Sequence, residues 1–206
     1  MTKERKSEIK QLALALYSKH FQRGSPASKM TQIILKEKLW YSEIVGCKDF
    51  LGALVKVNND PLHIMVNIAL NDKKMVGRKN FTIAHELGHY ALSHHLSGTS
   101  FFCKDGDVTE DGVGGNDQEI EANHFAACFL LPSDQLISQF NKWYKSKVYH
   151  GKLQDKANPS LHIKNARCTI WCQCAGVLKK HFAVSTATLK IRLVELDLIN
   201  DFPLNQ

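Results

Sequence analysis

Apolar residues recur at helical spacing over residues 7–21, the first stretch of the chain with a clear pattern. Five of them share one face: Ile9, Leu12, Ala13, Leu16 and Tyr17. Gly24 and Pro26 follow and disfavour continuation of the helix. An amphipathic helix is therefore expected near the N-terminus.

Two stretches in the next part of the chain have the pattern of β-strands. After a helical piece near residues 31–40, residues 50–58 combine apolar and β-branched side chains, and residues 62–70 alternate between apolar and polar ones. Asn-Asn-Asp-Pro at residues 58–61 separates the two stretches and predicts a turn. A small sheet is expected from these residues.

The middle of the chain is predicted to be helical on both sides of a long loop. Residues 80–95 have the apolar content of a buried helix, with Asn80 as its N-cap. Gly, Asp, Ser and Thr predominate in residues 96–117, which indicates a loop. Residues 116–131 then predict a helix that Pro132 ends.

Three more helices are predicted in the last third of the chain. The first spans residues 133–148 with Ser133 as its N-cap, and the other two span residues 168–182 and 186–199. Between them, residues 150–161 combine Gly, Asn-Pro and Ser with few apolar side chains, a composition typical of a linker.

Composition narrows the class of protein without indicating a function. The 206 residues carry a net charge of +7, a moderate excess that favours an acidic partner but is also common in proteins that bind none. No apolar run is long enough to cross a bilayer, and the first residues lack the apolar core and cleavage site of a signal peptide. A cytoplasmic protein that binds no membrane is therefore expected, with its six cysteines reduced.

Two histidines of the helix predicted over residues 80–95 have the spacing of metal ligands. His85 and His89 lie four residues apart in His-Glu-Leu-Gly-His, so both imidazoles project from one face of the helix. Imidazole nitrogen is a preferred ligand of Zn²⁺. Glu86 projects beside them, where it can take a proton from a water activated by the metal. His-Glu-x-x-His on a helix is the signature of that arrangement.

A catalytic zinc site needs a third protein ligand, and His95 is the first candidate by spacing. It lies ten residues after His85, but Leu92 stands where a glycine would turn the chain back toward the metal. A continuing helix would carry His95 about 15 Å along its axis and out of reach. We therefore interpret His94 and His95 as ordinary polar residues near the C-terminus of the helix.

A carboxylate from the helix over residues 116–131 is the better candidate for the third ligand. Glu119 and Asn123 lie four residues apart, so Glu119 can bind the metal while Asn123 hydrogen-bonds a ligand histidine and fixes its tautomer. The alternative role of Glu119 is in a capping box with Asn116. Glu121 is the second choice as ligand, because it projects from a different face than Asn123.

The two motifs together resemble the ImmA/IrrE family of metallo-endopeptidases, over roughly residues 50–135. Members of that family combine His-Glu-Leu-Gly-His with a later Glu-x-x-Ala-Asn-x-Phe-Ala-x-x-Leu-Leu-x-Pro. The second motif is matched here at Ala122, Phe125, Ala126, Leu130, Leu131 and Pro132. The resemblance implies a zincin-like α+β fold, in which a small mixed or antiparallel sheet packs on the helix of the first motif and on a second, ligand-bearing helix. It also implies a gluzincin-type zinc site with His85, His89 and Glu119 as ligands and Glu86 as the base.

The resemblance implies a substrate class as well, because known members of the family cleave or inactivate helix-turn-helix repressors. We therefore expect a zinc endopeptidase that cleaves a specific transcriptional repressor, with Mn²⁺ or Co²⁺ as substitutes for Zn²⁺. The alternative is a metal-containing regulatory factor without catalytic activity, or the partner of a toxin–antitoxin pair, acting by binding DNA or protein. An intact Glu86 argues against this alternative, since a purely structural metal site has no use for that carboxylate.

Further parts of the reaction site can be assigned only as candidates. A second donor to the oxyanion is usually needed in peptide hydrolysis, and Tyr90, His124 and Lys79 are the candidates for it. In related zinc peptidases an extended substrate lies along the edge of a sheet. Residues 62–70 are the candidate for that edge strand.

The linker over residues 150–161 divides the chain into two parts. The first is the peptidase domain over residues 1–150, and the second is a small helical module over residues 151–206. The module has the layout of a helix-turn-helix, with Ser185 as the N-cap of its last helix. A similar helical C-terminal ending is common in the ImmA/IrrE family.

Direct DNA binding by the module is not favoured over a packing or docking role. Four basic residues are available for phosphate contacts: Lys179, Lys180, Lys190 and Arg192. This is a modest number, and Ala183 stands where the turn of a helix-turn-helix usually has glycine. Three cysteines of the module are close in sequence, Cys168, Cys172 and Cys174, but their spacing fits no standard zinc site, so reduced thiols are expected.

Overall fold

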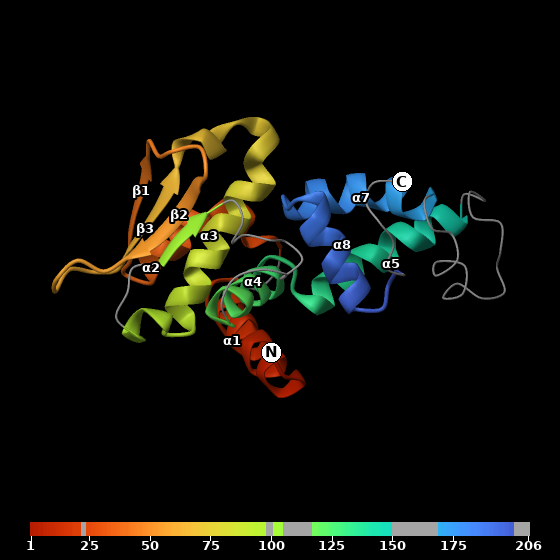
Figure 1. Cartoon of the computed structure of the whole chain (residues 1–206). Helices are drawn as coiled ribbons and strands as arrows, with labels where there is room; N and C mark the ends of the chain where they lie inside the picture. The colour runs from red at the N-terminus through yellow and green to blue at the C-terminus, as the bar shows by residue number, and fades with distance from the viewer. Residues whose placement is uncertain (22–23, 98–100, 105–116, 150–168, 200–206) are drawn as a thin grey trace.

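The computed structural model describes residues 1–21, 24–97, 101–104, 117–149 and 169–199. It shows a mixed α+β fold, as predicted, with one four-stranded sheet and several helices. The sheet lies at one end of the molecule and the C-terminal helices lie at the other (Figure 1). Within the described ranges, no helix combines the length and the apolar character that crossing a bilayer requires.

The sheet consists of four short strands: β1 (Trp40–Ile44), β2 (Phe50–Val55), β3 (His63–Asn67) and β4 (Phe101–Lys104). Their order across the sheet is β1-β3-β2-β4, with β1 parallel to β3 and β2 antiparallel to both of its neighbours. A turn at Asn58, whose φ is +48°, joins β2 to β3. The two strands and the turn that the sequence predicts are therefore confirmed.

The prediction that residues 62–70 form an edge strand is wrong. β3 pairs with β1 on one side and with β2 on the other, so its backbone is hydrogen-bonded on both sides. Among the described strands the edges are β1 and β4, which the sequence pattern does not predict. All residues of β1 are exposed or half-buried, and a strand of this kind needs no clear alternation of apolar and polar residues. β4 lies in a stretch with the composition of a loop.

Two helices bear the motifs: α3 (Val76–Ala91) and α4 (Asp117–Leu130). α3 lies against the sheet at Gly52 of β2, where an added Cβ would stand 2.6 Å from Thr82 Cγ2. α4 lies against α3 at Gly88, where an added Cβ would stand 3.1 Å from Ala122 Cα. Both glycines therefore allow the close approach that places α3 in contact with the sheet and with α4.

The apolar core lies between the sheet, α3 and α4. Side chains from all three are buried in it: Leu54, Ile64, Val66, Phe81, Leu87, Phe125 and Phe129. Burying one such side chain stabilises a fold by about 1.5–3 kcal/mol. The same packing that stabilises the domain therefore holds the polar residues of the two motifs at fixed positions.

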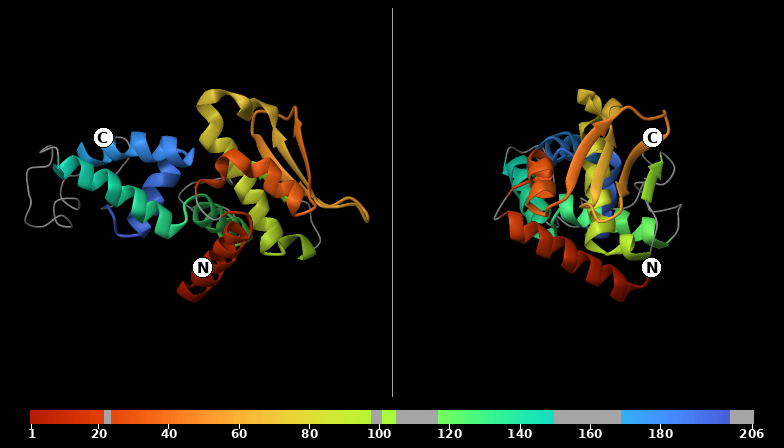
Figure 2. Two further views of the ribbon diagram at one scale, coloured as in Figure 1. Left: turned by 180° about the vertical axis from the view of Figure 1, so that it is seen from behind. Right: turned by 90° about the vertical axis from the view of Figure 1, so that its left-hand side faces the viewer.

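The N-terminal helix is longer than predicted: α1 (Lys3–His20) follows the N-cap Thr2. It lies alongside α4 (Figures 1 and 2), and it buries Ile9, Ala13 and Tyr17. Leu12, which the periodicity assigns to the buried face, stays 43% exposed. The short helix α2 (Met30–Lys36) leads to the sheet. The described connections contain four 3₁₀ helices: Pro26–Lys29, Ile68–Asn71, Lys73–Met75 and His94–Ser97.

The C-terminal part contains three described helices: α5 (Ser133–Tyr149), α7 (Thr169–Phe182) and α8 (Thr186–Glu195). They lie together at the end of the molecule away from the sheet (Figure 2). Ser185 caps α8 as predicted, and Ala183 makes the turn before it at φ +50°, a left-handed conformation that glycine usually adopts. The linker predicted over residues 150–161 lies outside the described residues, so the division into two domains stays a prediction.

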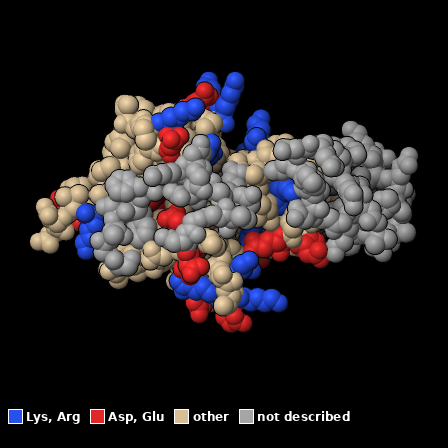
Figure 3. All heavy atoms as spheres, in the orientation of Figure 1, with Lys and Arg blue, Asp and Glu red and all other residues tan. Residues whose placement is uncertain are grey.

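Arg192 is not available for phosphate contacts, and that prediction is wrong. Its side chain is 2% exposed, and it donates hydrogen bonds to the carbonyl of Leu131 and to Ser133 Oγ. Ser133, which the sequence predicts as the N-cap of α5, is instead the first residue of that helix. Lys190 is buried too. On the face shown in Figure 3, the described basic side chains are interspersed with acidic ones. These observations favour a packing role for α8.

α3 begins earlier than predicted, and this changes the role of Asn80. The helix starts at Val76, so Asn80 lies inside it and is 7% exposed. Asn80 Nδ2 donates a hydrogen bond of 2.8 Å to the carbonyl of Ala183. Instead of capping α3, Asn80 joins it to the turn between α7 and α8.

Candidate metal centre

The structure brings together the three residues that the sequence predicts as metal ligands. His85 and His89 are buried one turn apart on α3, with their Nε2 atoms 3.0 Å from each other. Glu119 in the first turn of α4 places Oε2 3.0 Å from His85 Nε2 and Oε1 3.4 Å from His89 Nε2. Two atoms bound to one tetrahedral zinc at about 2.0–2.1 Å lie about 3.3 Å apart, which is close to these three distances.

The hydrogen bonds behind the histidines explain why these atoms suit a cation. His85 Nδ1 lies 2.9 Å from the amide oxygen of Asn123, which is an acceptor, so Nδ1 carries the proton and donates it. A neutral His85 then presents a lone pair at Nε2, toward His89 Nε2 and the carboxylate of Glu119. Facing lone pairs are unfavourable in a buried place unless a cation lies between them. Two imidazoles and one carboxylate are also the donor set of catalytic zinc sites that keep an open position.

The pKa shifts of His85, His89 and Glu119 are consistent with a site that attracts a cation. Burial lowers the pKa of His89 to about 4, so its imidazole is neutral at neutral pH. Burial also disfavours the charged form of His85, but the hydrogen bond to Glu119, the charges of Glu86 and Glu119 and the hydrogen bond to Asn123 together outweigh it and raise the pKa of His85. Burial by itself would raise the pKa of Glu119, whereas the hydrogen bonds from both histidines lower it to about 2. The charged carboxylate therefore attracts positive charge, which either a proton on His85 or a metal ion supplies.

Glu86 lies beside this group without joining it. It is fully buried, and neither of its carboxylate oxygens has a hydrogen-bond partner of ordinary geometry. Burial raises the pKa of Glu86 to about 8; His85 and the backbone N–H of Leu54 oppose the rise, and the charge of Glu119 adds to it. An added Cβ at Gly52 would stand 3.3 Å from Glu86 Oε1, so this glycine makes room for the carboxylate. An unsatisfied buried carboxylate is costly, and in a native fold it calls for a functional explanation.

The interpretation of His94 as an ordinary polar residue at a helix end is wrong. After α3 the chain turns at Ser93, whose φ is +58°, so the turn needs no glycine at Leu92. The turn brings His94, and not His95, back to the site. His94 is 6% exposed, and its Nδ1 lies 2.9 Å from His89 Nδ1. Burial lowers the pKa of His94, so the expected stabilisation of a charged imidazole by the helix terminus does not apply.

Glu121, the second choice as ligand, does not lie with Glu119 at the histidine pair. Its Oε2 lies 3.2 Å from His94 Nε2. Both of its oxygens accept hydrogen bonds from the guanidinium of Arg5, at 2.7 and 2.8 Å. Asn116, the partner of Glu119 in the alternative capping box, lies outside the described residues.

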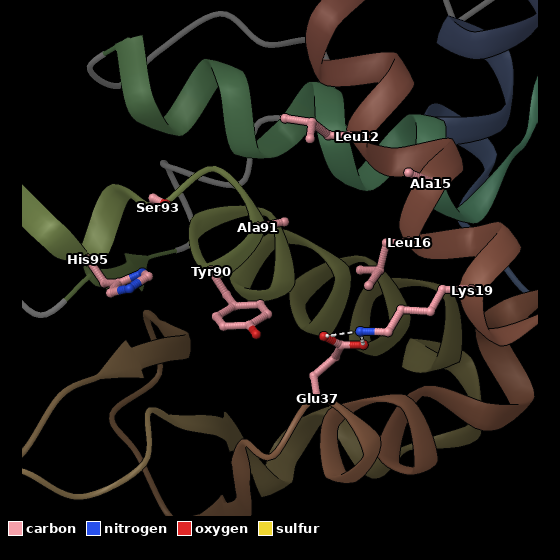
Figure 4. Close-up of a pocket in the computed structure, with 9 residues that line it drawn as sticks. All are labelled: Leu12, Ala15, Leu16, Lys19, Glu37, Tyr90, Ala91, Ser93 and His95. Carbon is pink, nitrogen blue, oxygen red and sulfur yellow. Dashed lines mark hydrogen bonds and ion pairs between the residues drawn. The ribbon is translucent and has the colours of Figure 1, made fainter.

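The three candidate oxyanion donors face other parts of the molecule. Tyr90 points into a surface pocket (Figure 4), which is also lined by Leu12, Leu16, Lys19, Glu37 and His95. His124 lies 3.2 Å from the carbonyl of Lys6 in α1. Lys79 pairs with Glu43 at the surface. The structure does not test a contact with a substrate, so the role of these three residues as oxyanion donors stays a prediction.

The cysteines considered for a second metal site are only partly described. Cys168 and the side chain of Cys172 lie outside what the structure describes. Cys174 is buried, and its thiol contacts the carbonyl of Trp171 at 3.5 Å. Among the described side chains, the group of His85, His89 and Glu119 is the one cluster suited to a metal ion.

Comparison with known proteins gives a family match. The Peptidase_M78 family, described as the IrrE N-terminal-like domain, matches residues 53–194, which is more than half of the chain. No curated protein matches. A solved structure titled as a Mycobacterium tuberculosis transcriptional regulator is similar at 16% identity and a TM-score of 0.49, over 94% of this chain and 48% of that one. This chain thus spans about half the length of that structure.

Proposed function

The chain belongs to the Peptidase_M78 family, and we propose that it is a zinc-dependent endopeptidase with His85, His89 and Glu119 as its metal ligands. Membership of a peptidase family supports the hydrolysis of peptide bonds in a protein substrate. The observation on which the proposal rests is the convergence of two imidazole nitrogens and a carboxylate beside the buried Glu86. A metal site that only stabilised the fold would not need the carboxylate of Glu86 beside it.

Each residue of the site has a separate role in the proposed reaction. A bound Zn²⁺ would supply Lewis-acid activation of a water molecule and of the scissile carbonyl, and Mn²⁺ or Co²⁺ would substitute for it. Glu86, in its deprotonated form, accepts the proton of the attacking water and returns it to the leaving nitrogen. Asn123 accepts the Nδ1 proton of His85 and so fixes the direction of its Nε2.

The proposed substrate is a transcriptional repressor with a helix-turn-helix domain. This part of the proposal rests on the resemblance of the two motifs to ImmA/IrrE endopeptidases. We propose the edge strand β4, in place of residues 62–70, as the strand along which an extended substrate binds. β4 pairs with β2, and β2 contacts Glu86 at Gly52, so a chain added at this edge would lie on the side of the sheet nearest to the base.

The module over residues 151–206 is proposed to support the peptidase domain. Asn80 in α3 donates to the carbonyl of Ala183, and Arg192 in α8 donates to the carbonyl of Leu131 at the end of α4. Both helices that bear metal ligands are therefore joined to the module. This arrangement favours a structural role over direct binding of DNA.

Metal analysis and one matched pair of variants test the proposed function. The purified protein should contain one zinc ion, and it should cleave the repressor encoded by the neighbouring gene. Glu86→Gln should keep the metal and lower cleavage by at least about 100-fold, as expected for loss of a general base. Glu4→Gln changes an exposed glutamate of α1 and should leave both properties unchanged.

Two results would contradict the proposal. Cleavage by Glu86→Gln at the rate of the unchanged protein would remove Glu86 from the mechanism. A protein that holds zinc but cleaves no repressor would instead favour the alternative, a regulatory factor that binds metal without catalysis.

A further inference from the structure

Behind His89, three side chains from separate elements follow one another at hydrogen-bond distance. His94 Nδ1 lies 2.9 Å from His89 Nδ1, and His94 Nε2 lies 3.2 Å from Glu121 Oε2. Arg5 then donates to both oxygens of Glu121, at 2.7 and 2.8 Å. The row therefore extends from the metal site in α3 through α4 to the first turn of α1.

The chemistry of the atoms sets the direction of each hydrogen bond in the row. Glu121 accepts from the Arg5 guanidinium, which has only donors, and a carboxylate accepts from His94 Nε2–H as well. A neutral His94 with its proton on Nε2 has a lone pair on Nδ1. His89 Nδ1 must then carry a proton and donate it to His94. As a result His89 Nε2 presents its lone pair toward Glu119, as a metal ligand requires.

The fold holds His94 in this position. The left-handed turn at Ser93 directs the chain back along α3, and His94 becomes 6% exposed. Its ring also lies edge-on to the ring of His89, with the two centroids 5.1 Å apart. Glu121 is held in turn by the forked guanidinium of Arg5, a geometry that fixes a carboxylate in two directions. His94 is thus restrained on both of its ring nitrogens.

We propose that His94 is a positioning residue for the metal ligand His89, and that Glu121 and Arg5 fix the tautomer of His94. This inference rests on the proposed metal site. The two ligand histidines then have different hydrogen-bond partners. His85 donates to the neutral amide of Asn123, whereas His89 donates to His94, whose own N–H is bound by the carboxylate of Glu121. Partners of this kind orient a ligand and make it a stronger donor, and losing one typically lowers metal affinity by about 10–100-fold.

Zinc affinity, measured by competition with a chelator, tests the proposal without any need for a substrate. His94→Leu removes both hydrogen bonds and should weaken zinc binding by about 10–100-fold. His94→Asn should recover most of the affinity, because Asn Oδ1 takes the place of His94 Nδ1 as acceptor. Arg5→Met should have a smaller effect in the same direction. His124→Leu is the control, since it removes another half-buried imidazole that contacts Lys6 and not the row.

The tautomer of His94 gives a second measurement that needs no variant. In the zinc-loaded protein, imidazole nitrogen shifts in NMR spectra should show His94 protonated at Nε2 alone and His89 protonated at Nδ1. A His94 ring with a proton on Nδ1 would overturn the proposal. So would equal zinc affinities of His94→Leu and the unchanged protein.

These outcomes are separable from failure of the proposed function. If the unchanged protein binds no zinc, the metal site itself is wrong, and the inference falls with it. If it binds zinc with an affinity that His94→Leu does not alter, only the positioning role is wrong. Loss of affinity in His94→Leu that His94→Asn restores supports the positioning role even if no repressor is cleaved.

Discussion

Gly88 of α3 lies directly against Ala122 of α4. An added Cβ at position 88 would stand 3.1 Å from the Cα and from the carbonyl oxygen of Ala122, which are backbone atoms that no rotamer change can move. His85 and His89 lie on α3, and Glu119 lies on α4. The contact between Gly88 and Ala122 therefore sets the distance between the two parts of the proposed metal site.

Gly88→Ala should force the two helices apart and weaken the site. We expect the free energy of unfolding to fall by about 1–3 kcal/mol, as for other overpacked positions. Zinc affinity should fall as well, because Glu119 moves away from the histidines. Thermal unfolding of the metal-free protein and chelator competition measure the two effects.

Gly176→Ala is the matched control for that variant. Gly176 is exposed in α7, and an added Cβ there would have nothing within 4 Å. Replacing a helical glycine in open space should stabilise the protein by about 0.5–1 kcal/mol. If Gly88→Ala kept the zinc affinity of the unchanged protein, the helix contact would not set the geometry of the site.

The candidate ligands are predictable from the sequence because helical periodicity fixes which side chains share a face. Four-residue spacing is enough to put His85 with His89, and Glu119 with Asn123, on two separate helices. Spacing does not say that those two helices meet. That step comes from the family resemblance, and the structure shows its physical basis in the close contact at Gly88.

The features that the sequence does not predict depend on contacts between distant segments. β4 is a strand because β2 pairs with it, but its four residues lie in a stretch rich in Gly, Asp, Ser and Thr, for which the sequence predicts a loop. His94 reaches His89 because Ser93 adopts a left-handed φ that is uncommon for residues other than glycine, asparagine and aspartate. Because a turn toward the metal is expected only with glycine at position 92, the sequence does not predict the turn at Ser93.

Asn123→Ala should lower zinc affinity while leaving the fold intact. The change removes the acceptor for His85 Nδ1–H, so the ring is no longer fixed with Nε2 toward the metal. Loss of such a partner typically costs about 10–100-fold in metal affinity. Asn123→Asp keeps an acceptor at the same place and should bind zinc at least as well as Asn123→Ala. Equal affinities of Asn123→Ala and the unchanged protein would show that Asn123 does not orient the ligand.

The lowered pKa of Glu43 should make the free energy of unfolding depend on pH in the acidic range. Hydrogen bonds from Asn71 and Lys79 lower the pKa of Glu43 from 4.5 to about 2. A pKa that is lower in the folded chain stabilises the fold above pH 4.5, and the stabilisation is lost as the pH falls toward 2. The side chain is 31% exposed, so the contribution should not exceed about 1 kcal/mol.

Urea unfolding at several pH values checks this prediction with Glu43→Gln as the comparison. The unchanged protein should be more stable than Glu43→Gln at pH 7, and the difference should shrink as the pH is lowered below 4.5. Added salt should reduce the difference at pH 7, because exposed charges are screened. A difference that grows on acidification would contradict the assigned pairing.

Arg192→Met should destabilise the protein through the junction of α4, α5 and α8. The change leaves the carbonyl of Leu131 and the hydroxyl of Ser133 without their buried donor, and an unsatisfied buried group costs about 1–3 kcal/mol. Lys180→Met removes an exposed cation from α7 and should change the free energy of unfolding by no more than about 0.5 kcal/mol. Urea unfolding of both variants, together with DNA binding measured at one salt concentration, separates packing from phosphate contact. Unchanged stability combined with lost DNA binding in Arg192→Met would overturn the packing role of α8.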